Sequence, residues 1–356
     1  GLVPYVLVTT RSATVAGTAA SDCLSRFSPS CGKEGAHILS FELLTVDGRL
    51  LRCTRDENAD VFFAAIGGFG YLGAITRVTY RLWSLGYAPA VETEVTPYRS
   101  MRDFLTALIP ASGVEGLYGA WFGQRALLFR SRYVERRRRR PLRLLHEPRS
   151  WLRACVDLLL RWQWFSRIGS WLTFNLIRRP RTFVDDYEDY AFFMDGNAHA
   201  KAIGRAFGAK MRTLQQTFVV PADVDTAARF IEELSDALRA AHIVPTLFDC
   251  LFVPRDEEFL LSSSAALDGF AVSIAFDTSD AAVLSRARAI LVEASARLHT
   301  IGGRVHLVKS VCADADDLRR MYGTRLDTFF SLKQRLDPTG VLRNEFLERT
   351  FPSYLP

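Results

Sequence analysis

A glycine-rich run contains the residues best suited to hold a cofactor. Residues 67–73 read Gly-Gly-Phe-Gly-Tyr-Leu-Gly, and Gly68, Gly70 and Gly73 match the G-x-G-x-x-G pattern of dinucleotide-binding units. In those units the pattern follows a strand and opens a helix. Here residues 58–65 predict a short helix before the run, and residues 76–82 alternate like a strand after it. This order argues against a nicotinamide site, and the glycines also permit a tight turn with positive φ.

Three further segments accompany the glycine run in a fixed order. They are the small-residue turn Thr14 to Ala20, the run Leu43 to Gly48 and the run Asp60 to Ile66. Together these segments resemble the FAD-binding domain of the vanillyl-alcohol oxidase and p-cresol methylhydroxylase class (PCMH-type). The resemblance implies that residues 1–88 form the C-terminal half of such a domain and that FAD is the cofactor.

The second half of the chain has the most regular pattern. Strands are predicted at residues 214–220, 246–253, 270–276 and 304–309. Helices are predicted to start at Pro221 and Asp223, and at Ser279 as a cap. The order β-α-β-β-α-β is the split βαβ arrangement. A hairpin is expected earlier, from residues 117–122 and 126–133. The sequence therefore predicts an α+β chain with a ferredoxin-like substrate domain over residues 89–303, followed by a segment, 304–356, that returns to the FAD domain.

Several blocks line up in order with the decaprenylphosphoryl-β-D-ribose 2-oxidase group of this class. They include Gln215 to Pro221, Gly302 to Lys309 and Lys333 to Arg343. The resemblance implies FAD contacts along the small-residue turn and sugar contacts on one strand. The residues it assigns to FAD are Thr9, Thr14, Val15, Ala16, Gly17, Ile75 and His306, and those it assigns to the substrate are Gln215, Thr217 and Lys309.

Lys309 is the candidate catalytic residue. A cation beside a flavin stabilises the negative charge that a hydride leaves on the reduced ring. The alternatives are a solvated lysine at a strand end, ordinary strand alternation for Gln215 and Thr217, and a structural, half-buried His306. No general base is assigned.

The chain departs from the group at several positions. Leu24 to Phe27 stand where the group has His-Gly-Lys-Asn, so no nucleophile remains there for a covalent flavin link, and FAD is expected to bind non-covalently. Ser273 replaces a pocket cysteine, and a pocket lysine is replaced around Asp249 or Cys250, which is expected to change substrate preference. The group's pyrophosphate-binding loop would precede Gly1. An incomplete, non-catalytic relative is therefore an alternative hypothesis.

Composition sets the broad class. With 356 residues and 49% hydrophobic content, the chain can bury a sizeable core and is expected to form two domains. The six cysteines are scattered without metal-ligand spacing, so neither a metal site nor a disulfide framework is expected. The start at Gly1 looks cut and carries no signal-type segment, which favours a cytoplasmic location.

Positive charge is concentrated in one segment. Residues 132–181 contain fourteen arginines and three acidic residues, a net charge of +11, whereas the whole chain carries +6. Trp and Leu residues are interleaved with the arginines, a composition that favours the surface of an anionic membrane. Its apolar stretches are shorter than the roughly 20 residues that span a bilayer. A solvated loop is the alternative, and nucleic acid is not expected because no nucleic-acid module surrounds the segment.

The sequence thus predicts an FAD-dependent oxidoreductase that takes a hydride from a secondary alcohol of a sugar or polyol. A lipid-linked sugar, a membrane inner face bound through residues 132–181, and a separate reductase are the candidate partners. A membrane-surface binding protein with a relic flavin fold is the remaining hypothesis.

Overall fold

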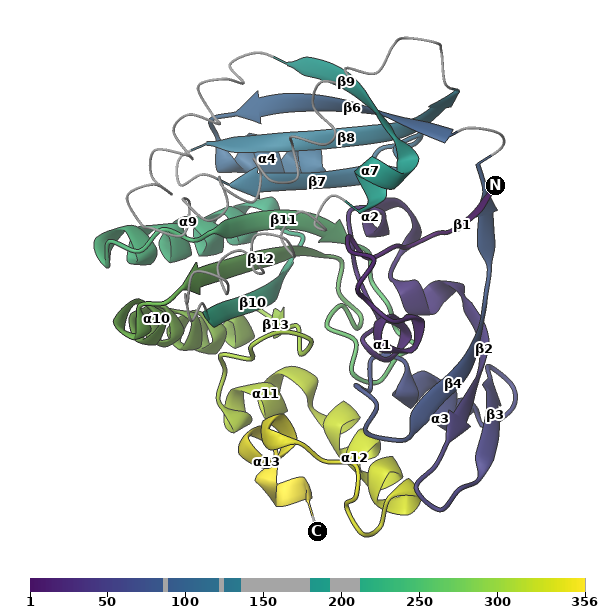
Figure 1. Ribbon diagram of the computed structural model, residues 1–356. Helices are drawn as coiled ribbons and strands as arrows, with labels where there is room; N and C mark the ends of the chain where they lie inside the picture. Colours follow the sequence, from purple (N-terminus) through teal and green to yellow (C-terminus); the bar gives the residue numbers. More distant parts are fainter. Residues whose placement is uncertain (86–88, 122–124, 136–179, 193–211, 356) are drawn as a thin grey trace.

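The computed structural model describes residues 1–85, 89–121, 125–135, 180–192 and 212–355. These residues form a mixed α/β fold with sheets of two, three and eight strands (Figure 1). Most of the basic, Trp-rich segment, residues 136–179, lies outside the described residues, so its predicted membrane contact is not tested. Within the described ranges, no helix is both long and apolar enough to cross a membrane.

The N-terminal part contains the two smaller sheets. Strands β1 and β5 pair with each other, and the second sheet has the order β3-β2-β4. Its elements are β1 (Leu2–Pro4), α1 (Val15–Ala20), α2 (Ser28–Cys31), a 3-10 helix (Glu34–His37), β2 (Ile38–Leu44), β3 (Leu50–Thr54), α3 (Ala59–Ala65), β4 (Ala74–Tyr80) and β5 (Leu82–Ser84).

The sequence predicts one short helix in this part, and α3 is that helix. The predicted turn over residues 14–20 is wrong, because residues 15–20 form helix α1. Thr14 caps it by accepting a hydrogen bond from the Gly17 N–H at 3.2 Å, and the alanines that follow are strong helix formers.

The glycine run lies between α3 and β4, so the predicted order of helix, glycine and strand is confirmed. Gly67, Gly70 and Gly73 have positive φ. A Cβ at Gly68 would lie 2.3 Å from the Ala64 carbonyl oxygen, and one at Gly73 would lie 2.6 Å from the Leu44 carbonyl oxygen. Tight backbone packing and turning therefore explain these glycines.

The large sheet is antiparallel and has the strand order β13-β10-β12-β11-β7-β8-β6-β9. The predicted hairpin is confirmed as β7 and β8, with Trp121 opposite Ala126. The strands are β6 (Pro89–Tyr98), β7 (Gly116–Trp121), β8 (Ala126–Glu135), β9 (Arg181–Asp186), β10 (Arg212–Pro221), β11 (Leu247–Val253), β12 (Gly269–Thr278) and β13 (Arg304–Val305).

The element order β10-α9-β11-β12-α10-β13 is the β-α-β-β-α-β order that the sequence predicts. Helix α9 (Val224–Ala240) connects β10 to β11, and α10 (Ala281–Thr300) connects β12 to β13. Asp280, rather than the predicted Ser279, caps α10. The last strand is also shorter than predicted. After Val305 the chain leaves the sheet, with two further backbone bonds to β10, from His306 N to Thr217 O at 2.9 Å and from Ser310 N to Gln215 O at 2.8 Å.

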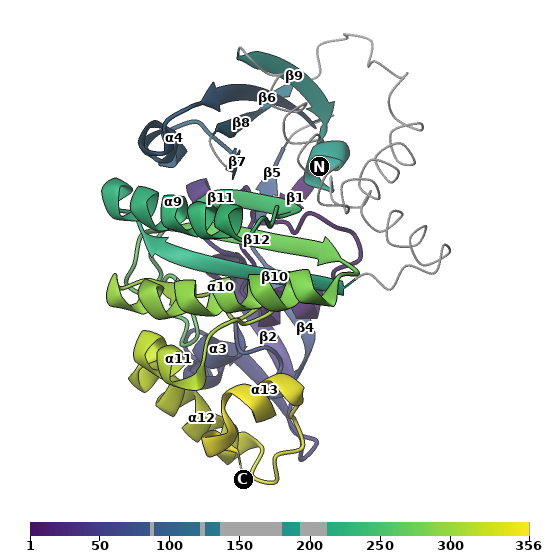
Figure 2. The ribbon, with the colours of Figure 1, turned by 90° about the vertical axis from the view of Figure 1, so that its left-hand side faces the viewer.

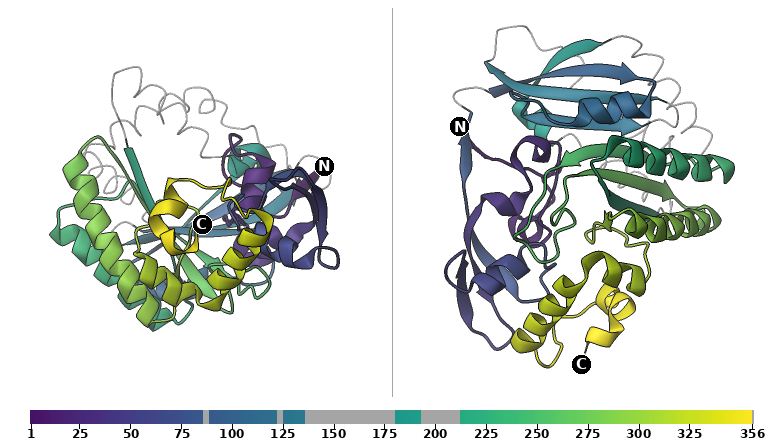
Figure 3. Two further views of the ribbon diagram at one scale, coloured as in Figure 1. Left: turned by 90° about the horizontal axis from the view of Figure 1, so that it is seen from below. Right: turned by 180° about the vertical axis from the view of Figure 1, so that it is seen from behind.

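Helices cover one face of the large sheet. Helices α9, α10 and α4 (Met101–Leu108) pack on this face, and Figures 2 and 3 show α9 and α10 lying along β10 and β12. The opposite face of β7 and β11 contacts α2 from the N-terminal part. A further short helix, α7 (Tyr187–Ala191), follows β9. The N-terminal part therefore meets the sheet on the face away from the long helices.

The C-terminal helices pack against the glycine run. They are α11 (Ala315–Tyr322), α12 (Thr324–Leu336), α13 (Glu345–Thr350) and a 3-10 helix (Pro352–Tyr354). Lys333 of α12 is 3% exposed and donates hydrogen bonds to the Tyr71 carbonyl at 3.1 Å and to Asp337 at 2.9 Å. The C-terminal helices and the glycine run, which are far apart in the sequence, thus pack together in the lower part of the molecule in Figure 1.

Candidate active site

A row of polar side chains crosses three strands of the large sheet. Thr217 of β10 lies opposite Ser273 of β12, and Ser273 lies opposite Asp249 of β11. Directly opposed residues in antiparallel strands point to the same face. The Thr217 and Ser273 hydroxyl oxygens are 2.8 Å apart, and Ser273 donates a hydrogen bond to Asp249. Gln215, two residues before Thr217, extends this polar row.

The polar row lies on the face away from the long helices. The alternate β10 residues Leu214 and Phe218 pack in the core with α9 and α10. Gln216 also points inward, where its side-chain oxygen accepts the Cys312 N–H at 2.7 Å. The expectation that Gln215 and Thr217 share one strand face therefore agrees with the burial of their neighbours.

His306 and Lys309 follow β13 at one end of the polar row. His306 is 8% exposed, and its Nδ1 lies 3.1 Å from the Ser263 hydroxyl. Burial, with the charges of Lys33 and Lys309, lowers the pKa of His306 to about 3. The imidazole is therefore neutral at physiological pH. Lys309 is exposed, and its charge acts on His306, Asp249 and Cys23.

Arg26 approaches the other end of the polar row. Its guanidinium carbon lies 4.4 Å from the centre of the Tyr118 ring, and its main chain accepts a hydrogen bond from Leu117 N at 2.8 Å. Tyr118 is two residues from Ala120, the strand neighbour of Asp249. The sequence marks Arg26 only as a departure from the group's His-Gly-Lys-Asn. Arg26 stands where that motif has a lysine, so the positive charge at this position is the signal in the sequence.

Asp249 is a carboxylate placed between these cations. Burial raises its pKa to about 6, while the hydrogen bond from Ser273 and the charges of Lys309 and Arg26 oppose the rise. Its Oδ1 is buried without a hydrogen-bond partner among the residues that the structure describes. Asp249 is therefore the member of the polar row with an open acceptor.

The residues assigned to FAD lie on two sides of this region. Thr14, Val15, Ala16 and Gly17 form the first turn of α1, where Val15 is 60% exposed. Helix α1 packs beside β4, the strand that contains Ile75. Thr9 is partly buried in the segment after β1. The charge of Lys309 reaches Cys23, three residues past the end of α1, so α1 and the segment after β13 are neighbours.

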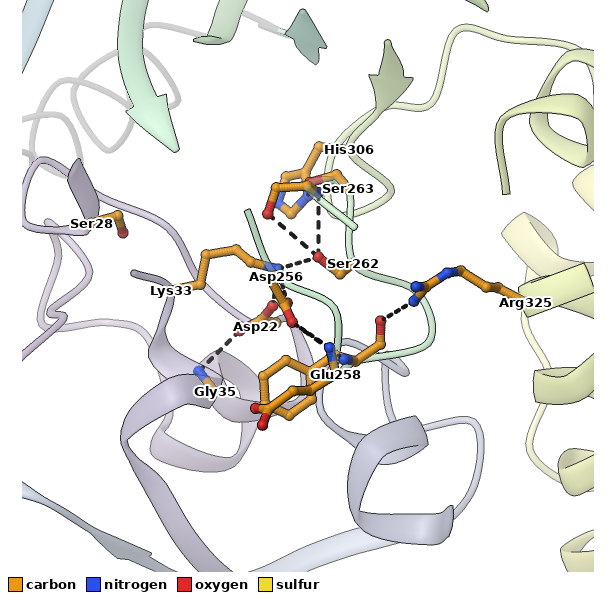
Figure 4. Close-up of polar contacts among 12 residues, drawn as sticks. Asp22, Ser28, Lys33, Gly35, Asp256, Glu258, Ser262, Ser263, His306 and Arg325 are labelled. Atoms are coloured by element: carbon orange, nitrogen blue, oxygen red, sulfur yellow. Dashed lines mark hydrogen bonds and ion pairs between the residues drawn. The ribbon is translucent and has the colours of Figure 1, made fainter. Parts of the chain in front are cut away.

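A buried ion cluster connects the N-terminal part to the loop between β11 and β12 (Figure 4). Lys33, with its side chain 3% exposed, bonds the carboxylate of Asp22, lies 3.0 Å from Asp256 and donates to the Ser262 hydroxyl at 2.6 Å. Burial lowers the pKa of Lys33, but the two carboxylates outweigh burial and raise it overall. Figure 4 shows Ser262 beside Ser263 and His306, so the ion cluster supports the loop that holds the imidazole.

Glu34 forms a second buried polar contact next to this cluster. It accepts hydrogen bonds from Thr18 of α1 at 2.8 Å and from Tyr80 of β4 at 2.6 Å. Burial raises the pKa of Glu34 to about 7, against the opposing effect of these hydrogen bonds.

The pKa of Glu34 predicts a pH-dependent stability. The carboxyl group of Glu34 binds its proton more tightly in the folded protein than in the unfolded chain. The wild type therefore loses stability as pH rises from 4.5 to about 7. Glu34→Gln keeps the accepting oxygen without the charge. We expect the free energy of unfolding of the variant to exceed that of the wild type by about 3 kcal/mol at pH 8, from about 1.4 kcal/mol for each pKa unit. Urea unfolding at pH 4.5 and 8 measures this, and equal pH profiles for the two proteins would contradict it.

Comparison with known proteins identifies the class to which this arrangement is related. Residues 209–350 match the family profile described as D-arabinono-1,4-lactone oxidase. Decaprenylphosphoryl-beta-D-ribose oxidase of Mycolicibacterium smegmatis is 25% identical over 372 aligned residues, which cover 98% of this chain and 76% of that protein. This chain is a relative of the FAD-linked oxidoreductases. Cytokinin dehydrogenase 7 of Oryza sativa subsp. japonica is 36% identical over 77 residues, which cover 22% of this chain and 15% of that protein.

The class predicted from the sequence is thereby confirmed, together with its FAD cofactor and its oxidase or dehydrogenase type. The roles assigned to single residues stay predictions. The family match covers every member of the site in the second half of the chain, namely Gln215, Thr217, Asp249, Ser273, His306 and Lys309.

The described residues fit a flavin at the junction of the two parts. The first turn of α1 is exposed. Its Gly17 N–H donates to Thr14, whereas the N–H groups of Val15 and Ala16 precede the first intrahelical bond and can donate to a cofactor. A Cβ at Gly17 would lie 2.8 Å from Thr14 Oγ1, so glycine keeps this turn close to its cap. The exposed cation of Lys309 lies on the same side as α1 and suits a ring that gains negative charge.

Proposed function

We propose that the chain oxidises a secondary alcohol of a sugar or polyol by hydride transfer to FAD. The observation that carries this proposal is the polar row of Gln215, Thr217, Ser273 and Asp249, whose carboxylate feels the charge of Lys309. Hydroxyl, amide and carboxylate groups are suited to bind a ligand with several hydroxyls. A nearby cation suits a redox reaction that leaves negative charge on the cofactor.

Each residue has a distinct proposed task. Bound FAD would supply the hydride acceptor, and the first turn of α1 with Thr9 and Ile75 would contact it as the resemblance implies. Lys309 would hold positive charge where negative charge develops. His306, neutral because of its burial, would pack beside the cofactor with its ring held by Ser263. Gln215 and Thr217 would orient the substrate hydroxyls.

The name of the mycobacterial relative supports a lipid-linked sugar as one form of the substrate. Such a substrate would favour a protein at the inner face of a membrane, contacted through residues 132–181. A separate reductase would then reoxidise the cofactor. The lipid-linked sugar, the membrane face and the reductase are therefore part of this proposal.

The test of this function is anaerobic reduction of the bound flavin. The FAD-loaded chain is mixed with xylitol, D-arabinono-1,4-lactone or a short prenylphosphoryl-ribose, and the visible flavin band is followed. We expect at least one of these probes to bleach the band at a rate that saturates with concentration. A flavin that none of them reduces, while dithionite does, would contradict the proposal.

A further inference from the structure

The hydrogen bonds along the polar row have a direction. Asp249 accepts from the Ser273 hydroxyl, which uses the only proton of that hydroxyl. Thr217 can then donate its own proton to Ser273 across their 2.8 Å contact. Both hydroxyls then point toward Asp249, and this carboxylate ends the chain as the final acceptor. Its second oxygen, Oδ1, is the buried atom that still lacks a donor among the described residues.

The groups around Asp249 leave it as the best proton acceptor of the site. Lys309 and Arg26 contribute positive charge. His306 is a weak base because burial lowers its pKa to about 3. Tyr118, on the neighbouring strand β7, has a pKa raised to about 12 by burial, and burial also raises the pKa of Cys250. At neutral pH the tyrosine and the thiol keep their protons and the imidazole is a weak base, whereas a carboxylate can accept a proton.

We propose that Asp249 accepts the hydroxyl proton of the substrate when the alcohol is oxidised. This inference rests on the proposed function. The O–H bond breaks and its proton passes to Oδ1 of Asp249. Bound FAD would supply the acceptor for the hydride of the neighbouring C–H bond, and the carbon–oxygen double bond would form. Loss of one proton and one hydride would turn the alcohol into a ketone, and the two electrons would reside on the flavin. The proton then leaves Asp249 for solvent.

The charges facing Asp249 give the reaction a defined pH dependence. Only the ionised carboxylate can accept a proton, and its pKa is about 6. The rate constant of flavin reduction should therefore rise with pH through about 6 and then level off. Asp249 is therefore the group that sets the midpoint.

The experiment compares Asp249→Asn, Asp249→Glu and wild type, each loaded with FAD, by anaerobic stopped-flow reduction between pH 5 and 8. The substrate is the probe of the previous subsection that reduces the wild type. We expect Asp249→Asn to lower the limiting rate constant by about 10²–10⁴ and to remove the pH dependence. Asp249→Glu should regain part of the rate constant and part of its pH dependence. Asp236→Asn, an exposed carboxylate on α9, is the matched control and should leave both unchanged.

Two further measurements distinguish the loss of a proton acceptor at Asp249 from a loss of folding or of bound cofactor. The flavin absorption spectrum and urea unfolding of each variant report whether cofactor and fold are intact. Infrared difference titration of wild type against Asp249→Asn should show a carboxyl group with a midpoint near pH 6 without any substrate. An Asp249→Asn enzyme whose flavin is reduced at the wild-type rate and with the wild-type pH dependence would overturn this inference and leave the proposed function standing. A wild-type flavin that no probe reduces would overturn the proposed function and this inference with it.

Discussion

Replacing Lys33 with methionine is expected to lower the free energy of unfolding by about 3–5 kcal/mol, the range for breaking a buried ion pair on one side. The ammonium lies between the carboxylates of Asp22 and Asp256, and its side chain is 3% exposed. Without it, two buried carboxylates would face each other with no counter-charge. Burial already raises the pKa of Asp22, which the loss of Lys33 would raise further.

Urea unfolding of the purified variants measures this loss. Arg49→Met is the matched control, because its ion pair with Asp47 is exposed and such pairs contribute about 0–1 kcal/mol. Adding Asp22→Asn to Lys33→Met removes one uncompensated charge and should recover part of the stability. A Lys33→Met protein as stable as the control variant would contradict the proposed role of the cluster.

Replacing Lys309 with alanine is expected to lower the rate constant of flavin reduction by about 10²–10³, the range for removing one group that stabilises developing charge. Lys309 is exposed, so the loss should leave folding unchanged. Its charge acts on His306, Asp249 and Cys23, which places it where the sheet and the end of α1 meet. The effect should therefore appear in the chemical step.

Stopped-flow reduction with the same probe substrate measures the change. Lys309→Arg keeps the charge and should retain more of the rate than Lys309→Ala. Arg286→Ala, an exposed cation on α10, is the control for a general loss of positive charge. A Lys309→Ala protein with the wild-type rate would remove Lys309 from the mechanism.

The second half of the fold could be predicted because its local signals agree with its tertiary structure. Helix α9 has apolar residues at helical spacing that pack into the core, and Asp223 caps it as expected. The sequence predicts too long a strand for β13 because the apolar alternation continues past Val305, whereas only Arg304 and Val305 form the strand. The period of the apolar residues indicates which side chains are buried, but it does not indicate where the backbone hydrogen bonds between strands end.

The candidate site could be predicted only where single residues match a family pattern. The resemblance assigns Gln215, Thr217, His306 and Lys309 to the site in this way, and their roles stay predictions. Lys33 was not assigned, because its partner Ser262 is 229 positions away and no local pattern connects them. Asp249 was recognised as a charge reversal, but its place at the end of a hydrogen-bonded row depends on the register of three strands.

The most direct test of the central claim is the visible absorption spectrum of the purified chain after incubation with excess FAD and gel filtration. We predict that flavin bands elute with the protein and that they bleach when a probe alcohol is added without oxygen. Free flavin eluting apart from a folded, flavin-free protein would contradict the claim that this chain is an FAD-dependent oxidoreductase.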